Sequence, residues 1–232
     1  MSNSIFRIPI QVSMDKKCIR LIVMEDIRFW IGIVATMAFA VTGVLAIADR
    51  GVDLFGVLVL GLITAIGGGT MRDIILEAPI FWADNQLYVW LALSASVLTF
   101  FAESFFTQPQ ICRWMLYIDG FGAALFAIQG ADKAWNMNFG LPLAPVILGL
   151  ITAIGGGLLR DVLAGRKTLL MSHELYAIPV TLGCCAYVLV LNFLPQYVVE
   201  GSVICMLGIF GLRAAAIYWD LRVPKMFITK TR

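Results

Sequence analysis

Charged residues are scarce in this sequence. Of its 232 residues, 14% are Asp, Glu, Lys or Arg and 60% are hydrophobic. A soluble domain is about half apolar and carries about a quarter charged residues, so the composition excludes an ordinary soluble domain. The net charge of +2 gives no reason to expect a nucleic-acid partner, because the basic residues lie at the ends of apolar runs.

Residues that build metal sites and active sites are also few. His173 is the single histidine, and no pair of cysteines has CxxC spacing. The pattern GxxxxGK[ST], a Ser/His/Asp set and a paired-carboxylate cleft are all missing. We therefore expect no enzyme activity, no metal centre and no cofactor. We interpret the cysteines as small packing residues: Cys18, Cys112, Cys184, Cys185 and Cys205.

The sequence contains several long apolar runs. A helix needs about 20 predominantly apolar residues to cross a bilayer. The runs predict an all-α membrane protein with seven transmembrane helices, in which charge interrupts the fourth and the seventh. With seven spans, 232 residues leave no room for a soluble domain. The predicted spans are 29–48, 54–76, 87–105, 114–133, 143–164, 175–194 and 201–219.

The distribution of basic residues predicts the orientation in the membrane. Residues 1–24 are polar and lack the apolar core of a signal peptide, so we interpret them as a flexible tail or an upstream start. Arg50, Arg113, Arg166 and Lys167 lie on the side that also receives the C-terminus. The positive-inside rule then puts the C-terminus in the cytoplasm and the N-terminus outside, in a multi-pass plasma-membrane protein.

The sequence repeats itself. Residues 61–69 read GLITAIGGG, and residues 149–157 read GLITAIGGG again, 88 positions later. An Arg-Asp pair follows each copy, and FAVTG at 39–43 has a weaker echo in FAIQG at 126–130. We therefore divide the chain into a tail (1–26), two three-helix repeats (27–110 and 111–196), a seventh helix (197–222) and a second tail (223–232).

Each repeat contains an odd number of spans. The second repeat therefore enters the membrane from the opposite face, which gives the inverted topology of many transporters and some channels. The two GLITAIGGG segments are expected to meet near the middle of the membrane.

Three consecutive glycines within a span are unfavourable for a helix. Each costs about 1 kcal/mol of helix propensity relative to Ala, and exposed backbone in lipid costs several kcal/mol more. We interpret the glycines as kinks or breaks in spans two and five that serve as hinges or line a pore. The alternative is close helix packing by small residues. The candidates are Gly67, Gly68, Gly69, Gly155, Gly156 and Gly157.

The Arg-Asp pairs after the glycines are candidates for a pore or gate. Arg72, Asp73, Arg160 and Asp161 are ionisable groups close to apolar spans, where such groups are expensive and often functional. Carbonyls freed by a break could face a cation, and a half-helix N-terminus favours an anion such as lipid phosphate. Two structural alternatives remain open: anchoring at the interface, and an Arg–Asp clasp between the repeats.

The fourth span adds Asp119 and Lys133 to the candidates. Their counterparts in the first span are Gly32 and Ala46, so the two halves differ in charge. Lys133 either extends to the interface or projects into a water-filled path. Arg213 in the seventh span either pairs within the bundle or anchors one end.

These motifs resemble the TRIC family, the trimeric intracellular cation channels, in its prokaryotic branch, whose members are often described as having two glycine-transporter domains. The resemblance covers about residues 27–222. It rests on GGGTMRDIIL at 67–76 and GGGLLRDVLAG at 155–165, supported by FAVTG, by FAIQGADKA at 126–134 and by HELYA at 173–177.

The resemblance implies a homotrimer in which each protomer is a separate channel for monovalent cations, potassium especially. The path would be an hourglass between the repeats, with spans two and five bent at the glycines. Lys133 matches a lysine implicated in gating. Gly32 stands where the family pattern leads us to expect an acidic partner of Asp119. Besides the other protomers, the expected partner of the protein is membrane lipid.

Two other functions remain open from the sequence. One is a secondary transporter of a small solute such as glycine, which inverted repeats with broken helices also suit. The other is a lipid-regulated scaffold without permeation. The potassium-filter signature TVGYG is missing, so we expect weak selectivity between potassium and sodium.

Overall fold

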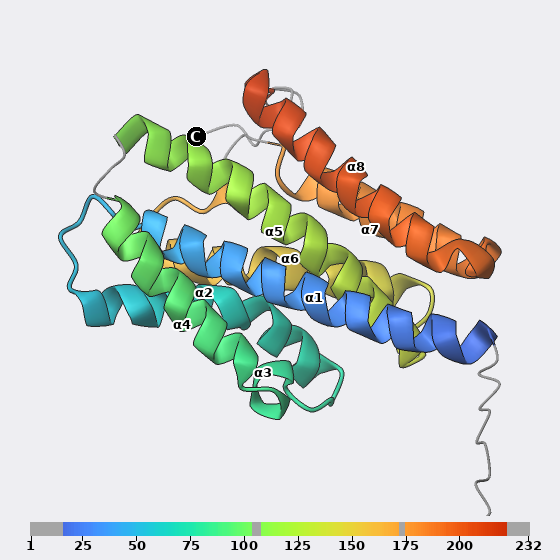
Figure 1. The fold of residues 1–232 in the computed structure, drawn as a ribbon. Coiled ribbons are helices and arrows are strands. Elements are labelled where there is room, and N and C mark those ends of the chain that lie inside the picture. The colour runs from blue at the N-terminus through green and yellow to red at the C-terminus, as the bar shows by residue number, and fades with distance from the viewer. Residues whose placement is uncertain (1–15, 104–107, 172–174, 222–232) are drawn as a thin grey trace, which may run out of the picture.

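The computed structural model describes residues 16–103, 108–171 and 175–221, and within these ranges it contains eight α-helices (Figure 1). Two 3₁₀ turns, Leu169–Met171 and Pro195–Tyr197, lie between them. The helices are α1 (Lys16–Leu45), α2 (Leu54–Ile75), α3 (Phe81–Asp84), α4 (Leu87–Ala102), α5 (Gln108–Asn136), α6 (Leu143–Leu163), α7 (Ala177–Phe193) and α8 (Val198–Tyr218).

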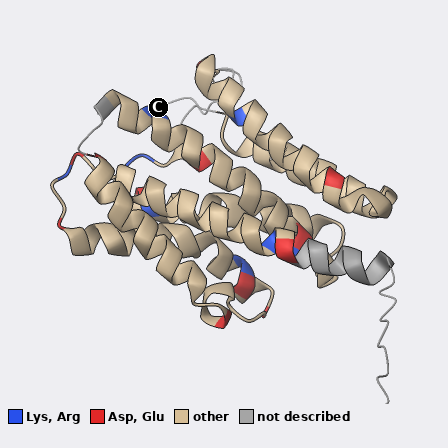
Figure 2. Ribbon diagram, in the orientation of Figure 1, with Lys and Arg blue, Asp and Glu red and all other residues tan. Residues whose placement is uncertain are grey.

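Five of these helices are long and apolar enough to cross a membrane: α1, α2, α5, α6 and α8. Each of the seven predicted spans coincides with one of the longer helices, but α4 and α7 have only 16 and 17 residues. Figure 2 shows long stretches of helix without Lys, Arg, Asp or Glu. The molecule is therefore an all-helical, multi-pass membrane protein.

The start of the first helix corrects the sequence prediction. Residues 1–24 were expected to be a tail, but α1 begins at Lys16, and only residues 1–15 lie outside the described part. The sequence has neither Gly nor Pro between Lys16 and Ile31, so nothing stops the helix from extending toward the N-terminus. In the same way α5 begins at Gln108, earlier than the predicted residue 114.

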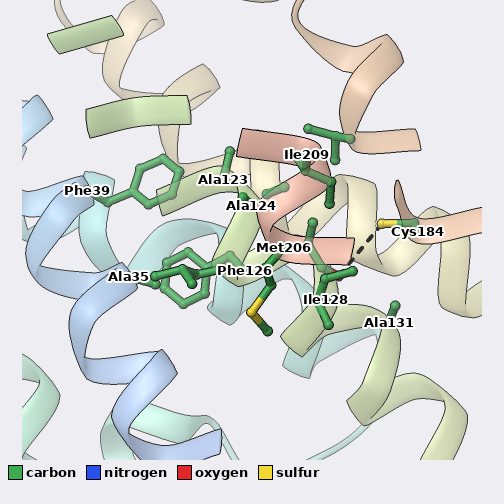
Figure 3. Close-up of a cluster of buried hydrophobic side chains, with 14 of the residues drawn as sticks. Ala35, Phe39, Ala123, Ala124, Phe126, Ile128, Ala131, Cys184, Met206 and Ile209 are labelled. Atoms are coloured by element: carbon green, nitrogen blue, oxygen red, sulfur yellow. Dashed lines mark hydrogen bonds between the residues drawn. The ribbon is translucent and has the colours of Figure 1, made fainter. Parts of the chain in front are cut away.

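The two halves of the chain meet along α1 and α5. These helices lie side by side and run in opposite directions (Figure 1), as an inverted repeat requires. Phe39 of α1 stacks on Phe126 of α5 with ring centroids 5.5 Å apart (Figure 3). The two residues are 87 positions apart, so they are equivalent residues of the two repeats. Helix α4 packs against α1 and α2, and α7 and α8 pack on α5.

The triple glycines lie within unbroken helices, so the prediction of breaks is wrong. Helices α2 and α6 continue through them and contact each other. A Cβ on Gly68 would collide with the carbonyl oxygen of Thr152, and a Cβ on Gly156 would collide with that of Thr64. The helices thus approach backbone to backbone, which was the packing alternative. Tertiary contact outweighs the low helix propensity of glycine here.

We predict that Gly68→Ala and Gly156→Ala each destabilise the protein by about 1–3 kcal/mol, because a methyl group there overpacks a backbone contact. Gly208→Ala is the matched control, since Gly208 lies in a helix with open space around it. The measurement is the thermal midpoint of purified protein in detergent. Equal midpoints for all three variants would contradict the packing assignment.

Candidate functional site

The Arg-Asp pairs at the ends of α2 and α6 have equivalent geometry. Arg72 Nε lies 2.7 Å from Asp73 Oδ1, and Arg160 Nε lies 2.9 Å from Asp161 Oδ1. The second carboxylate oxygen accepts a backbone N–H eight residues later in both cases. Asp73 Oδ2 accepts from Phe81 at 3.0 Å, and Asp161 Oδ2 accepts from Leu169 at 2.9 Å. Each aspartate therefore fixes the segment that follows its helix.

These four charged residues are buried in protein. Arg72 is 3% exposed, Asp73 0%, Arg160 0% and Asp161 2%. Such burial argues against a role as anchors in the headgroup region. Because each arginine pairs with the aspartate beside it, the proposed Arg–Asp clasp between the repeats is wrong. Buried ions must be paired and hydrogen-bonded, which these arrangements achieve locally.

Lys133 makes one of the ion pairs that cross between the halves. Its Nζ atom lies 2.8 Å from Asp73 Oδ1, so a lysine of α5 and an arginine of α2 share one carboxylate. The Lys133 side chain is 31% exposed, whereas Asp73 is fully buried. The partly exposed Lys133 side chain therefore reaches from the edge of the protein to a buried carboxylate.

The second half contains a larger network of charges. Arg160 Nη1 lies 2.7 Å from Asp119 Oδ1, and both side chains are fully buried. Arg213 of α8 lies over the ring of Tyr176, with its guanidinium carbon 4.6 Å from the centroid, and donates to the Leu175 carbonyl at 3.2 Å. The alternative in which Arg213 pairs within the bundle is therefore confirmed.

The described residues of the first half form no counterpart of this network, and the two halves differ in charge at the positions of Asp119 and Lys133, as the sequence predicted. Gly32 lies against the Tyr88 hydroxyl, where the equivalent residue Asp119 would place a carboxylate. Ala46, the counterpart of Lys133, contributes only its carbonyl, which accepts from Arg166 Nη1 at 2.7 Å. In formal charge the first cluster sums to +1 (Arg72, Lys133, Asp73), and the second sums to zero (Arg160, Arg213, Asp119, Asp161).

The glycines of the two motifs adjoin these clusters. A Cβ on Gly157 would lie 3.3 Å from Asp119 Oδ1 and 3.5 Å from Arg160 Nη2, and Gly69 faces the Phe81 ring. The structure thus brings the predicted glycines and ionisable residues together at two related places, one in each half.

Sequence reasoning missed a third set of polar contacts. Asp132 interrupts the apolar run of the fourth predicted span, and its Oδ2 lies 2.6 Å from Arg28 Nε while its Oδ1 accepts from Tyr187 at 2.9 Å. The available signal was an acidic residue in an apolar helix, which requires a partner. Asp132 and Lys133 are consecutive, so the end of α5 is bound to α1 and α7 through one residue and to α2 through the next.

The described residues offer no grouping of three or more His, Cys, Asp or Glu side chains that could hold a metal ion. The ionisable residues that the structure does bring together form buried ion pairs, with Lys133 the partly exposed member.

The sequence is similar to a known family of membrane proteins. A family model described as "Glycine transporter" matches residues 29–104 and 116–192. The UPF0126 inner membrane protein YadS of Escherichia coli strain K12 is 37% identical over 199 residues, 84% of this chain and 94% of that protein. A UPF0126 membrane protein of Vibrio cholerae is 34% identical over 210 residues, 88% of this chain and 85% of that protein.

Solved structures show the same fold. The TRIC trimeric intracellular cation channel orthologue from Rhodobacter sphaeroides superposes with a TM-score of 0.79 at 32% identity, covering 84% of this chain and 99% of that one. A structure described as explaining conductance through TRIC cation channels has a TM-score of 0.72 at 30% identity, covering 87% and 98%.

We predict that Asp119→Ala destabilises the protein by about 3–5 kcal/mol, because it removes one of two carboxylates from the fully buried Arg160. The control is Asp49→Ala, which changes an exposed aspartate and is expected to have an effect near zero. Thermal unfolding in detergent compares the two variants. A normal midpoint for Asp119→Ala would mean that Asp161 alone neutralises Arg160.

Proposed function

The chain belongs to the family of TRIC cation channels and bacterial UPF0126 membrane proteins, and we propose that it is a potassium-permeable channel for monovalent cations. One pore lies in each protomer of a homotrimer. The likeness to solved TRIC channels supports the cation channel. The observation that carries the assignment within this chain is the contact of Lys133 with Asp73, which joins the two halves where an ion path between them would run.

In this proposal Lys133 is the gating residue. Its side chain is partly exposed and its ammonium group shares Asp73 with Arg72, so Lys133 can leave the carboxylate without stranding a buried negative charge. Helices α2 and α6 contact each other at the glycines, which shuts the path at that level. In this proposal the arrangement is that of a closed channel, and opening requires movement at both places. Asp119, Arg160 and Asp161 hold the second half rigid around this path.

The proposal also assigns the number of membrane crossings and the side on which each terminus lies. Helices α4 and α7 are short but apolar, and we count them as the third and sixth of seven crossings. The antiparallel α1 and α5 and the two separate matches of one family model support an inverted repeat. The N-terminus lies outside and the C-terminus in the cytoplasm.

A secondary transporter of a small solute such as glycine is the alternative, and the name of the family model is what favours it. The distinction is kinetic, because a carrier is never open to both sides at once. Recording from purified protein in planar bilayers separates the two: discrete current steps support the channel, and solute flux without such steps supports the carrier.

We predict that Lys133→Ala raises open probability or conductance and weakens voltage dependence. The variant removes a positive charge that repels cations and a contact that closes the path. Moving one charge across the full membrane potential is worth about 2.3 kcal/mol per 100 mV, so a partial displacement of Lys133 biases the closed–open equilibrium by about 1 kcal/mol. Single-channel recordings over a range of voltages measure both effects.

Lys133→Arg is the control for this experiment, since it keeps the charge and should keep most of the wild-type gating. Arg72 still pairs with Asp73 in both variants, so we expect both to fold. Wild-type gating in Lys133→Ala would remove this residue from the gate.

The proposed topology is testable by cysteine labelling. In a background without the five native cysteines, we expect Lys167→Cys to react with a membrane-impermeant reagent from the cytoplasm and Pro79→Cys to react from outside. These residues follow α6 and α2, which run in opposite directions through the membrane in the proposed topology. Labelling of both positions from one face would refute the inverted repeat.

A further inference from the structure

The end of α5 carries two consecutive ionisable residues whose partners lie on different helices. Asp132 Oδ2 lies 2.6 Å from Arg28 Nε of α1, and its Oδ1 accepts from the Tyr187 hydroxyl of α7 at 2.9 Å. Lys133 Nζ lies 2.8 Å from Asp73 Oδ1 of α2. Successive residues of an α-helix point about 100° apart, so these contacts hold α5 from two directions and fix its rotation about its own axis.

We call the group of Asp132, Arg28 and Tyr187 the Asp132 anchor. Its acceptor is buried, because Asp132 is 6% exposed and Tyr187 is 1% exposed. About one turn earlier on α5, the Gln129 side chain donates to the Arg28 carbonyl at 3.1 Å. Helix α5 therefore holds both the side chain and the backbone of Arg28. A turn of α5 that withdraws Lys133 from its partner on α2 would also disturb the Asp132 anchor.

The equivalent place in the internal repeat is apolar. At the offset of 87 that relates α1 to α5, Asp132 corresponds to Leu45 and Arg28 corresponds to Met115. Leu45 and Met115 belong to one buried apolar cluster. Apolar contacts thus suffice to pack these two helices at their other end, and replacing a buried ion pair by apolar residues of similar volume often costs no stability. Packing alone therefore does not account for the charged pair of Arg28 and Asp132.

We propose that Asp132 is a positioning residue of the gate, which holds α5 at the rotation that brings Lys133 to Asp73. Hydrogen bonds to a carboxylate weaken steeply when their angles change, whereas apolar contacts are not directional. Lys133 is the partly exposed member of its own pair, and the buried Asp132 anchor restricts the direction in which its side chain leaves α5. The effect on gating rests on the proposed channel function, and the effect on the position of Lys133 does not.

The first measurement needs no current. Purified protein in detergent is treated with acetic anhydride, and the acetylation rates of Lys133 and the exposed Lys167 are followed by mass spectrometry. Asp132→Asn removes the charge that holds Arg28, so Lys133 should leave its partner more often and react about tenfold faster than in the wild type. Lys167 should keep its wild-type rate. Asp26→Asn makes the same change at an exposed position of α1 and should leave both rates unchanged.

A double variant separates positioning from folding. Arg28→Met combined with Asp132→Leu copies the apolar pair of the first half, so we expect a thermal midpoint near that of the wild type. Lys133 should nevertheless be acetylated faster, as in Asp132→Asn. In planar bilayers, Asp132→Asn should raise the open probability by about tenfold. In a Lys133→Ala background the same substitution should have no further effect, because the Asp132 anchor acts through Lys133.

Three results would overturn the proposal. One is acetylation of Lys133 at the wild-type rate in Asp132→Asn or in the double variant. Another is a double variant that no longer folds, which would make the ion pair a requirement of the fold. The third is an equal gating change of Asp132→Asn with and without Lys133. If the wild-type protein passes no current, the channel proposal fails, and the acetylation rates still decide whether Asp132 positions Lys133.

Discussion

The contact between α2 and α6 at their glycines is the constraint on which the rest of the structure depends. Gly68 faces a carbonyl of α6, and Gly156 faces a carbonyl of α2, so two backbones touch where any side chain would separate them. The Arg-Asp pairs follow within one or two turns of this contact on each helix. The paired side chains are buried at the ends of these two closely packed helices. The ion pair of Lys133 with Asp73 then joins α5 to α2.

Charge is distributed unequally over a backbone arrangement that is nearly the same in the two halves. Asp73 and Asp161 each accept a backbone N–H eight residues later, yet only Asp161 lies in a network with a second carboxylate and a second arginine. In the first half, Gly32 leaves the corresponding place without a carboxylate, and Lys133 of the other half supplies an additional cation. The charged cluster of the second half is therefore neutral in formal charge. The cluster around Asp73 keeps a formal charge of +1, and its Lys133 side chain is partly exposed.

Much of the fold could be predicted because its signals are local or repeated. Apolar runs located all seven longer helices, and GLITAIGGG located the two halves. That the helices continue through the glycines could not be predicted in the same way. Helix propensity indicated a break, whereas the contact that favours unbroken helices is made with a segment 88 residues away. The partners of Lys133 and Asp132 were missed for the same reason, since Asp73 lies 60 residues from the first and Tyr187 55 residues from the second.

Helix α8 packs on α5 and α7, and the described residues of the first half contain no equivalent helix. This asymmetry has a consequence for the orientation of the chain in a membrane. Two antiparallel halves of similar shape would exchange places if the molecule were turned upside down, so the six helices alone distinguish poorly between the two faces of the bilayer. A single odd helix removes that ambiguity, because it packs against α5 and α7 and has no equivalent among the described residues of the first half. In the proposed topology, α8 and the basic loops on one side together give the two related halves a single orientation.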